Sequence, residues 1–323
     1  MNLKFLFASG KNAKLPYYIR NYAKVILPKY IFQSRLSKKM ETINSRPDTD
    51  YITSRVDYYN KLKTVQELPD SSQLFGELKK SKKVKSVYFL DAYRVISWFK
   101  GSFKWNYVPG DVTHIPEIPS IVKSRPISGD NSNSVLLKLD AVRHFIFIRD
   151  RQKFSEKLDK IIFRGKVDNK PHRIAFMEKY FDHPMCDLGN ITSKNTSRPE
   201  WTVEKCTLYD HLQYKFVLAL EGNDVASNLK WIMSSNSIAV MPKPKFETWF
   251  MEGKLVANYH YIEIKNDYSD LEERLNYYIK NQDKANQIIR NANQYVSQFF
   301  DRKREHLIGL AVMNKYLEKT GQK

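Results

Sequence analysis

Residues 221–224 (Glu-Gly-Asn-Asp) have the composition and position of an anion-binding turn. They follow an apolar segment, 214–220, whose aromatic and branched residues predict a buried strand. Asp224 is placed to cap a helix, because apolar residues recur at helical spacing between 225 and 233. The N–H groups of such a helix start bind anions, most simply a diphosphate. The alternative is an ordinary turn without a ligand, because most helix starts in such folds bind nothing.

A second candidate site follows the predicted strand 159–163. The strand is followed by a glycine turn and then by a predicted helix over 172–180, and cationic side chains lie along this path: Arg164, Lys166, Lys170 and Arg173. A guanidinium group matches two phosphate oxygens at once, which suits Arg164 and Arg173 to a diphosphate. The alternative for Arg164 is a structural arginine that holds the end of the strand in place.

The elements that position these residues form a strand–turn–helix–strand unit, which ends in a second apolar strand at 237–241. Such a unit belongs to a parallel sheet, where ligands bind at the carboxyl ends of the strands. Residues 1–80 are predicted to be mainly helical, with a turn at Arg46-Pro47-Asp48. Helical spacing also extends over 271–300 and 305–317. Short apolar runs between them indicate a further α/β unit: 84–90, 105–108, 120–123, 136–139 and 144–148.

Composition predicts a folded protein of the reduced cytoplasm. Hydrophobic residues make up 42% of the 323 residues, which is enough for a core. Cys186 and Cys206 cannot make a disulfide framework, and the first residues do not have the pattern of a signal peptide. No window approaches 18 uninterrupted apolar residues, so no membrane span is expected.

The formal net charge of +19 favours a polyanionic partner. Within 10–40, lysines and arginines alternate with aromatic and aliphatic residues, a mixture typical of a segment on an anionic membrane surface. Pro16 and Pro28 predict two short helices rather than one. The alternative is a basic, solvated helix that packs on the rest of the protein. Nucleic acid is not expected as a partner, because no zinc-finger, RRM or helix-turn-helix pattern is present.

The order of motifs in the C-terminal part resembles glycosyltransferase family 90. The stretches that carry the resemblance are Leu220-Glu221-Gly222, Val225-Ala226-Ser227-Asn228, Ser234-Ser235-Asn236-Ser237, Glu247-Thr248-Trp249-Phe250 and Tyr259-His260-Tyr261-Ile262-Glu263. The likeness is greatest to the lipopolysaccharide core branch and covers nearly the whole chain. It implies an α/β fold of GT-B type: two Rossmann-type domains with a cleft between them, plus a helical N-terminal segment.

The resemblance also sets the expected organisation of the chain. We expect a helical basic segment at 1–80, an acceptor-side α/β domain at 81–155, a nucleotide-sugar-binding α/β domain at 156–300 and a C-terminal helix at 301–323. The donor-binding residues that it implies are Arg164, Gly165, Lys166, Arg173, Glu221, Gly222, Asn223, Asp224, Ser227, Asn228, Lys230 and Glu247. Asn228 stands where animal members have an arginine, so that arginine's phosphate contact does not transfer to it, and Lys230 is a candidate replacement.

Sugar transfer needs a base for the acceptor hydroxyl. Asp111 follows a strand in a Gly-Asp turn, and it precedes Lys123 as the catalytic aspartate of the family precedes its Phe-Ser-Lys-Thr motif. From the residues alone, an aspartate after glycine is more often a turn former. Asp91 is the alternate base, since it also follows a predicted strand. The expected acceptor-binding residues are Lys123, Ser124, Arg125, Asn131 and Asn133.

No metal or other cofactor is expected, because the only Asp-x-Asp, at Asp48 and Asp50, has the position of a helix cap. The sequence therefore predicts an inverting, UDP-sugar-dependent hexosyltransferase, peripheral on the cytoplasmic face of the bacterial inner membrane. It would transfer glucose or galactose to a lipopolysaccharide or lipooligosaccharide core sugar. The alternative is a basic nucleic-acid- or membrane-binding adaptor with an inactive transferase-like fold.

Overall fold

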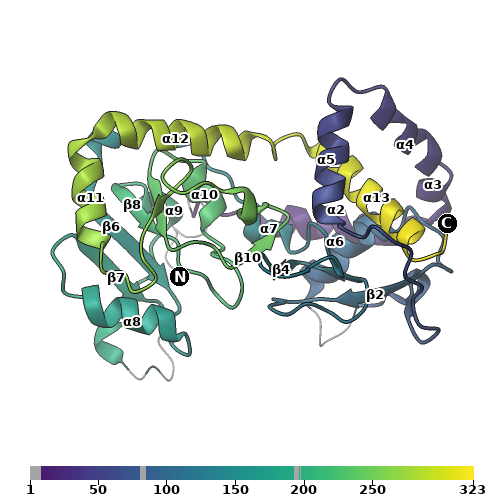
Figure 1. Cartoon of the computed structure of the whole chain (residues 1–323), viewed down its shortest axis with the longest axis horizontal. Coiled ribbons are helices and arrows are strands. Elements are labelled where there is room, and N and C mark those ends of the chain that lie inside the picture. Colours follow the sequence, from purple (N-terminus) through teal and green to yellow (C-terminus); the bar gives the residue numbers. More distant parts are fainter. Residues whose placement is uncertain (1–8, 81–84, 193–195, 197) are drawn as a thin grey trace.

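A computed structural model describes residues 9–80, 85–192, 196 and 198–323. The fold is mixed α/β, with two mainly parallel sheets at opposite ends of an elongated molecule (Figure 1). We call them the first and second sheets, in chain order. Among the described residues, no helix is both long and apolar enough to cross a membrane.

The second sheet is entirely parallel and contains the predicted strand–turn–helix–strand unit. Its strands, in spatial order, are β11 (Ile262–Glu263), β9 (Ile238–Met241), β8 (Tyr214–Leu218), β6 (Leu158–Gly165) and β7 (Cys186–Asn190). Ile161, Phe216 and Val240 are fully buried in its core, as expected for a parallel sheet covered on both faces. The helices associated with it are α8 (Pro171–Tyr180), α9 (Leu208–His211), α10 (Leu229–Met233), α11 (Leu271–Lys280) and α12 (Gln282–Ser297).

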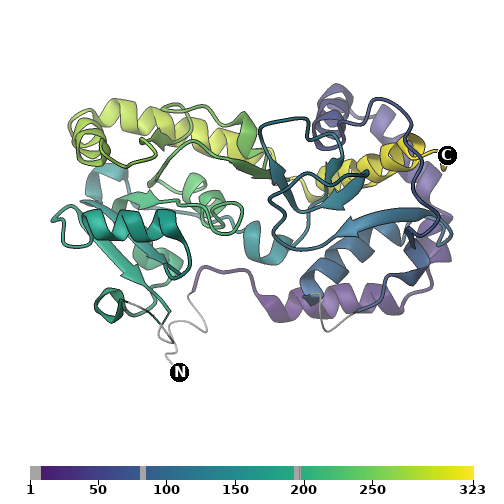
Figure 2. The same ribbon diagram turned by 60° about the horizontal axis from the view of Figure 1, so that its bottom comes forward.

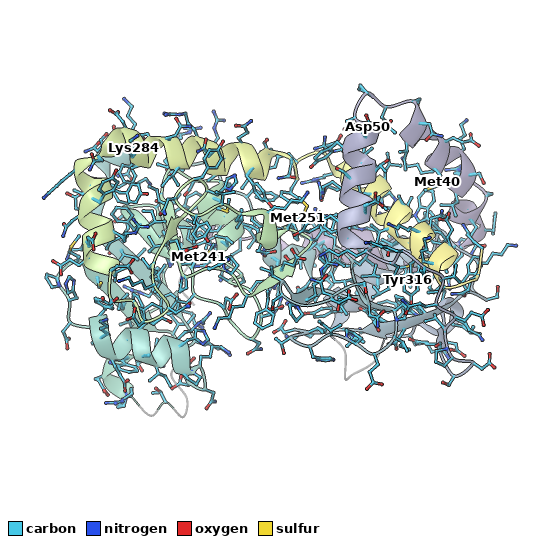
Figure 3. The ribbon with its side chains drawn as sticks, viewed as in Figure 1. Met40, Asp50, Met241, Met251, Lys284 and Tyr316 are labelled. Carbon is cyan, nitrogen blue, oxygen red and sulfur yellow. The ribbon has the colours of Figure 1, made fainter. Side chains whose placement is uncertain are left out.

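The first sheet has the order β1-β2-β3-β5, with β1 antiparallel and the others parallel. Its strands are β1 (Gln73–Leu74), β2 (Lys104–Val108), β3 (Ser120–Val122) and β5 (Ser134–Leu136). The last helix, α13 (Arg302–Lys319), returns to this part and packs on α5 (Thr49–Tyr59) and α6 (Ser86–Ile96). Helix α13 also bonds to the segment before β3, because the hydroxyl of Tyr316 (labelled in Figure 3) donates to the Pro119 carbonyl at 2.8 Å.

A short antiparallel pair joins the two parts: β4 (Ser124–Pro126) comes from the first and β10 (Phe246–Thr248) from the second. Arg125 lies opposite Glu247 in this pair. The remaining elements are α2 (Lys14–Ile26), α3 (Tyr30–Gln33), α4 (Leu36–Asn44), α7 (Ala141–His144), η1 (Phe75–Glu77), η2 (Phe154–Glu156), η3 (Pro199–Trp201) and η4 (Glu252–Lys254). The predicted break at Pro28 and the turn at Arg46-Pro47-Asp48 are both confirmed.

Three structural predictions are wrong. The described part of the run 84–90 is helical and begins α6, whose residues are nearly all buried; a short apolar run without polar alternation does not distinguish a helix from a strand. The run 144–148 begins with the last residue of the short helix α7, and its other residues are irregular. The helix expected to begin after Asp224 begins only at Leu229, so Asp224 does not cap it.

Candidate active site

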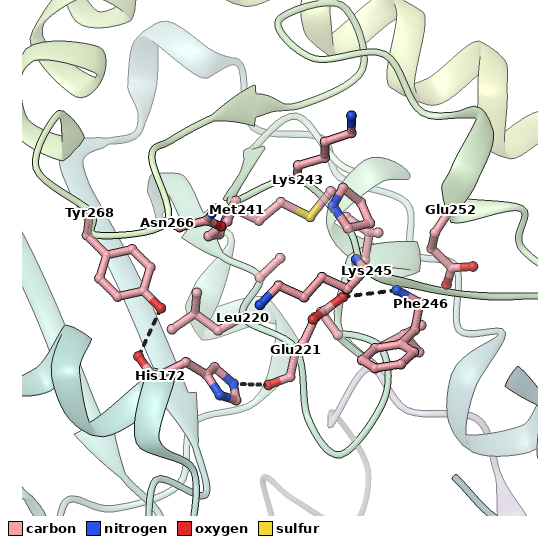
Figure 4. Close-up of a pocket in the computed structure, with 16 residues that line it drawn as sticks. His172, Leu220, Glu221, Met241, Lys243, Lys245, Phe246, Glu252, Asn266 and Tyr268 are labelled. Carbon is pink, nitrogen blue, oxygen red and sulfur yellow. Dashed lines mark hydrogen bonds between the residues drawn. The ribbon is translucent and has the colours of Figure 1, made fainter. Parts of the chain in front are cut away.

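A pocket lies at the carboxyl ends of β8 and β9, where the parallel sheet predicts a ligand site (Figure 4). Its empty volume is about 680 Å³, including the part open to solvent. Leu220, Met241 and Phe246 give it apolar walls, and Glu221, His172 and Tyr268 give it polar ones. This mixture of apolar walls with a few converging polar groups is typical of small-molecule sites.

Hydrogen bonds fix the polar wall of the pocket. The Glu221 carboxylate accepts from the backbone N–H of Lys245 at 2.8 Å, and burial raises its pKa despite this bond. His172 Nε2 lies 2.9 Å from the Glu221 carbonyl, and the Tyr268 hydroxyl donates to the His172 carbonyl at 2.9 Å (Figure 4). These bonds hold α8, β8 and the loop before β10 together around the pocket.

Cations border this pocket without carboxylate partners. Lys243 and Lys245 line its exposed edge, and among the described residues neither forms an ion pair. Arg173 lies behind its wall and donates to main-chain carbonyls of Glu221 at 2.9 Å and Leu220 at 2.8 Å. Burial lowers the pKa of Arg173 to about 10, so the guanidinium stays charged at neutral pH. The exposed Lys243 and Lys245 are therefore available to an anion, whereas Arg173, which also donates to the Lys166 carbonyl at 2.7 Å, adds its charge from behind the wall.

Arg164 has a different environment. It matches the alternative of a structural arginine that holds the end of strand β6 in place. Its Nη2 donates to Asp187 Oδ1 at 2.5 Å and its Nη1 to the Asp187 carbonyl at 2.8 Å. Tyr214, at the first residue of β8, donates to the same carboxylate. The guanidinium thus ties β6 to β7 and points back along the sheet.

Asp111 lies after β2 and contacts both parts of the molecule. Lys123 Nζ is 2.5 Å from its Oδ1, and Asn223 Nδ2 donates to its Oδ2 at 2.9 Å. Partial burial alone would raise the pKa of Asp111, but the hydrogen bond and charge of Lys123 lower it to about 2. Asp111 is therefore ionised at neutral pH, with 28% of its side chain exposed.

The Asp111 contact extends into a chain of charges that reaches the 221–224 loop. Lys123 also pairs with the buried carboxylate of Asp224 at 2.6 Å. Lys170 Nζ donates to Asn223 Oδ1 at 2.6 Å, and Asn223 in turn reaches Asp111. The structure thus brings together the predicted base Asp111, the predicted acceptor ligand Lys123 and the predicted donor ligands Asn223 and Asp224.

Asp91 was predicted as the alternate base because it follows a predicted strand, and that strand prediction is wrong. It lies inside helix α6 rather than after a strand, and its side chain is fully buried. Tyr17 donates to its Oδ1 and the Ala141 backbone N–H to its Oδ2, both at 2.8 Å. An acceptor hydroxyl could not reach this carboxylate without displacing the helices around it.

Two proposed donor ligands are instead buried in ion pairs near the β4–β10 pair. Glu247 pairs with Arg125 Nε at 2.8 Å, and its other oxygen accepts from Tyr58. Lys230 pairs with Glu252 at 2.6 Å, and both side chains are buried. Their charges are already neutralised, so these residues do not present charge to a diphosphate in this conformation.

The residues expected to bind the acceptor mostly hold loops of the first part. Arg125 is fully buried and also donates to the carbonyls of Tyr58 and Ser134. Ser124 bonds Val112, and the side-chain amides of Asn131 and Asn133 donate to loop carbonyls. Of this set, Lys123 alone lies beside Asp111.

The remaining donor candidates have minor or exposed positions. Asn228 Nδ2 donates to the Leu218 carbonyl at 2.9 Å, while Ser227 and Lys166 are exposed. Gly165 and Gly222 lie at the carboxyl ends of β6 and β8, and a side chain on Gly165 would collide with Phe163. Asp48, of the Asp-x-Asp, pairs with Arg46 and Arg304, and its carboxylate makes no capping bond.

The sequence reasoning missed several residues of the pocket. Lys243 and Lys245 directly follow β9, and His172 and Tyr268 meet beside them. The Pro-Lys-Pro-Lys run after a predicted parallel strand was a usable signal, because strand ends of that kind bind ligands.

Comparison with known proteins identifies the family. The glycosyl transferase family 90 model matches residues 138–318. The O-glucosyltransferase LpsA of Dichelobacter nodosus is 39% identical over 305 residues, which is 94% of this chain and 95% of that protein. Protein O-glucosyltransferase 3 of Homo sapiens is 23% identical over 172 residues, covering 52% of this chain and 33% of its own length. The chain therefore belongs to glycosyltransferase family 90, and it is a glycosyltransferase.

Proposed function

We propose that this glycosyltransferase moves a hexose, glucose or galactose, from a UDP-sugar to a sugar hydroxyl of a lipopolysaccharide or lipooligosaccharide core, with inversion. The observation that carries the proposal is the pocket bordered by Lys243 and Lys245 and backed by Arg173, with the ionised Asp111 bonded to its loop through Asn223. The name of the D. nodosus relative, O-glucosyltransferase LpsA, supports a hexosyl donor and this class of acceptor.

The proposed architecture is GT-B. Two mainly parallel sheets, each with its own helices, support it, as does the position of the pocket at strand ends that point toward Asp111. In this arrangement the part that carries the second sheet binds the nucleotide sugar and the part that carries the first binds the acceptor. The proposed boundary near residue 155 falls in the one-turn helix η2, just before β6.

The residues divide the chemistry between charge and proton transfer. The cations at the pocket would stabilise the negative charge that builds up on the departing diphosphate. Asp111 would accept the proton of the acceptor hydroxyl as its oxygen bonds to the sugar carbon and the bond to the diphosphate breaks. A carboxylate with a pKa of about 2 is a weak base while Lys123 bonds it, so an acceptor that separates Lys123 from Asp111 would strengthen the base.

We also propose that the reaction is independent of metal ions and that the enzyme is peripheral on the cytoplasmic face of the inner membrane. The unpaired cations of the pocket support the first proposal, because they can neutralise a diphosphate. Exposed Ile19 and Ile26 on α2, within a basic segment, support the second.

A thermal-shift series with UDP, GDP, CMP and their sugars tests the donor. UDP and one UDP-hexose should raise the melting temperature, because a ligand that binds only the folded state stabilises it. Product formation on a truncated lipooligosaccharide should then depend on that sugar and should continue in EDTA. A protein that no nucleotide stabilises would contradict the donor site, and activity restored by Mn²⁺ after chelation would contradict the metal-free reaction.

A further inference from the structure

Lys123 is a buried cation that is shared between two carboxylates, one from each part of the molecule. Its Nζ lies 2.5 Å from Asp111 Oδ1 and 2.6 Å from Asp224 Oδ2. The Lys123 side chain is 2% exposed and the Asp224 side chain 4%, whereas that of Asp111 is 28% exposed. Of the two carboxylates, Asp111 is therefore the one that is open to an acceptor from solvent.

The Lys123–Asp224 pair crosses between the two parts of the molecule. Lys123 lies between β3 and β4 of the first part, and Asp224 lies in the loop after β8 of the second. The second part, mainly teal and green in Figure 2, lies next to the first, mainly blue and purple. The same loop supplies Asn223, whose side-chain amide donates to Asp111 Oδ2 at 2.9 Å. The loop after β8 thus contacts the proposed base directly through Asn223 and indirectly, through Lys123, from Asp224.

The balance of charge around Lys123 changes when Asp111 takes up a proton. Before proton uptake, one ammonium group lies between two carboxylates. After it, Lys123 and Asp224 remain as a neutral pair beside a carboxylic acid. Without Asp224, the same step would leave a buried ammonium group with no counter-charge, which is strongly unfavourable. The position of Asp224 therefore removes a penalty that proton uptake by Asp111 would otherwise carry.

We propose that Asp224 is a positioning residue, which holds Lys123 and thereby strengthens Asp111 as the base; the inference rests on the proposed role of Asp111 in sugar transfer. The negative charge of Asp224 favours the protonated form of the nearby Asp111. Asp224 also keeps the ammonium group when an acceptor hydroxyl takes the place of Lys123 beside Asp111. In this role Asp224 acts on proton transfer, although the sequence predicted it as a donor ligand.

Turnover of the full chain at saturating UDP-hexose and truncated lipooligosaccharide tests this proposal. Asp224→Asn should lower turnover at neutral pH by about tenfold, because Lys123 then has Asp111 as its only carboxylate and the base is weaker. The affinity for UDP, measured by isothermal titration, should change less than about threefold. The matched control is Asp150→Asn, since Asp150 pairs with buried Lys157 at 2.8 Å in the segment before β6. It should lower stability and leave turnover per folded molecule within about twofold.

Combined variants separate this role from a merely structural one. Adding Lys123→Met to Asp224→Asn should recover most of the lost turnover, since no ammonium group then remains to keep Asp111 ionised. Asp224→Glu should retain more turnover than Asp224→Asn, because it keeps the negative charge. In the Asp111→Asn background, Asp224→Asn should cause no further loss, because Asp224 acts through Asp111. A merely structural role would give additive losses and no recovery, and would overturn the proposal.

Two further outcomes distinguish this inference from the proposed function. Loss of turnover in Asp111→Asn with full turnover in Asp224→Asn would overturn this inference alone, as would weaker UDP binding by Asp224→Asn with unchanged turnover. Full turnover in Asp111→Asn would overturn the proposed base and this inference with it. Circular dichroism and the UDP thermal shift check that each variant is folded. Should Asp224→Asn not fold, Asp224→Ser, whose hydroxyl can accept from Lys123, must give the same loss and the same recovery.

Discussion

The pocket at β8 and β9 and the β4–β10 junction both contain cations, and the sequence marks Arg173, Arg125 and Lys230 among them as candidates for ligand binding. At the pocket, Lys243, Lys245 and Arg173 lack carboxylate partners among the described residues. At the junction, Arg125 pairs with Glu247 and Lys230 with Glu252, and all four side chains are buried. Cations of the first kind can accept an incoming anion, whereas those of the second kind are neutralised inside the fold, and the Arg125–Glu247 pair joins the two parts of the chain.

The comparison indicates that a cation's role depends mainly on whether a carboxylate is paired with it. The residue type and its position in a motif matter less. Arg125 and Glu247 are 122 residues apart in sequence, so nothing near either residue reveals the pair. Asp111 and Lys123 lie between these two regions: they form an ion pair, yet Asp111 stays partly exposed and contacts the loop of the pocket.

The largest effect on turnover should come from Asp111→Asn. This variant tests whether an aspartate that is ion-paired and still partly exposed acts as the base. Turnover should fall by roughly 10²- to 10⁴-fold, the range for loss of a general base, while the UDP-induced thermal shift is retained. Initial rates at saturating donor measure it. Near-wild-type turnover would remove Asp111 from the chemistry and leave it a bridge between the two parts. Asp91→Asn is the contrast, because it should lower stability and leave turnover per folded molecule nearly unchanged.

At the junction, Arg125→Met should lower the free energy of unfolding by about 3–5 kcal/mol, because it leaves the Glu247 carboxylate buried without a cation beside it. Urea unfolding measures the change, with Arg302→Met, at an exposed position of α13, as the control. Adding Glu247→Leu to the variant should recover much of the loss, since an apolar pair replaces an ionic one at little cost. A drop in UDP affinity per folded molecule, without lost stability, would instead move Arg125 to the ligand site.

At the pocket, Arg173→Ala should weaken UDP binding by about 1.5–3 kcal/mol, or roughly 10- to 150-fold, if the guanidinium contacts the diphosphate. Isothermal titration of UDP measures it. Arg164→Ala is the matched control, on strand β6 of the same sheet. It should alter UDP affinity less than about threefold, because the Arg164 guanidinium is paired with Asp187. A larger effect at Arg164 than at Arg173 would reverse this assignment.

The smallest effect concerns stability in acid. The pKa of Asp111 is lowered from 3.8 to about 2, so its interaction with Lys123 stabilises the fold fully above pH 4. That contribution should be lost as the pH falls from about 4 to about 2. The difference in unfolding free energy between wild type and Asp111→Asn should therefore be constant above pH 4 and shrink below it. A difference that persists unchanged at pH 2 would contradict the ion pair.

The sequence predicted the second sheet well because β6, β8 and β9 are apolar runs closed by glycine or polar turns, a pattern that few other structures share. It failed at α6, where burial on all sides removes the periodicity that separates helix from strand. The structure has a pocket at the strand ends where the sequence predicted a ligand site, yet most of the individual residues assigned to that site do not line it. Motif resemblance fixed the order of segments along the chain, whereas the direction of each side chain depends on partners from distant segments.

The return of α13 has a consequence for how the chain is made. Glu305, near the start of this helix, pairs with buried Arg55 at 3.0 Å and with Lys138 at 2.9 Å, and Tyr316 bonds the segment before β3. Residues 302–319 are therefore part of the structure around the first sheet, although they are synthesised after the strands of both sheets. During synthesis, the second sheet can assemble while the earlier segment still exposes the surface that α13 covers. The N-terminal half should be the later half to complete its folding and the one that depends on chaperones while it waits.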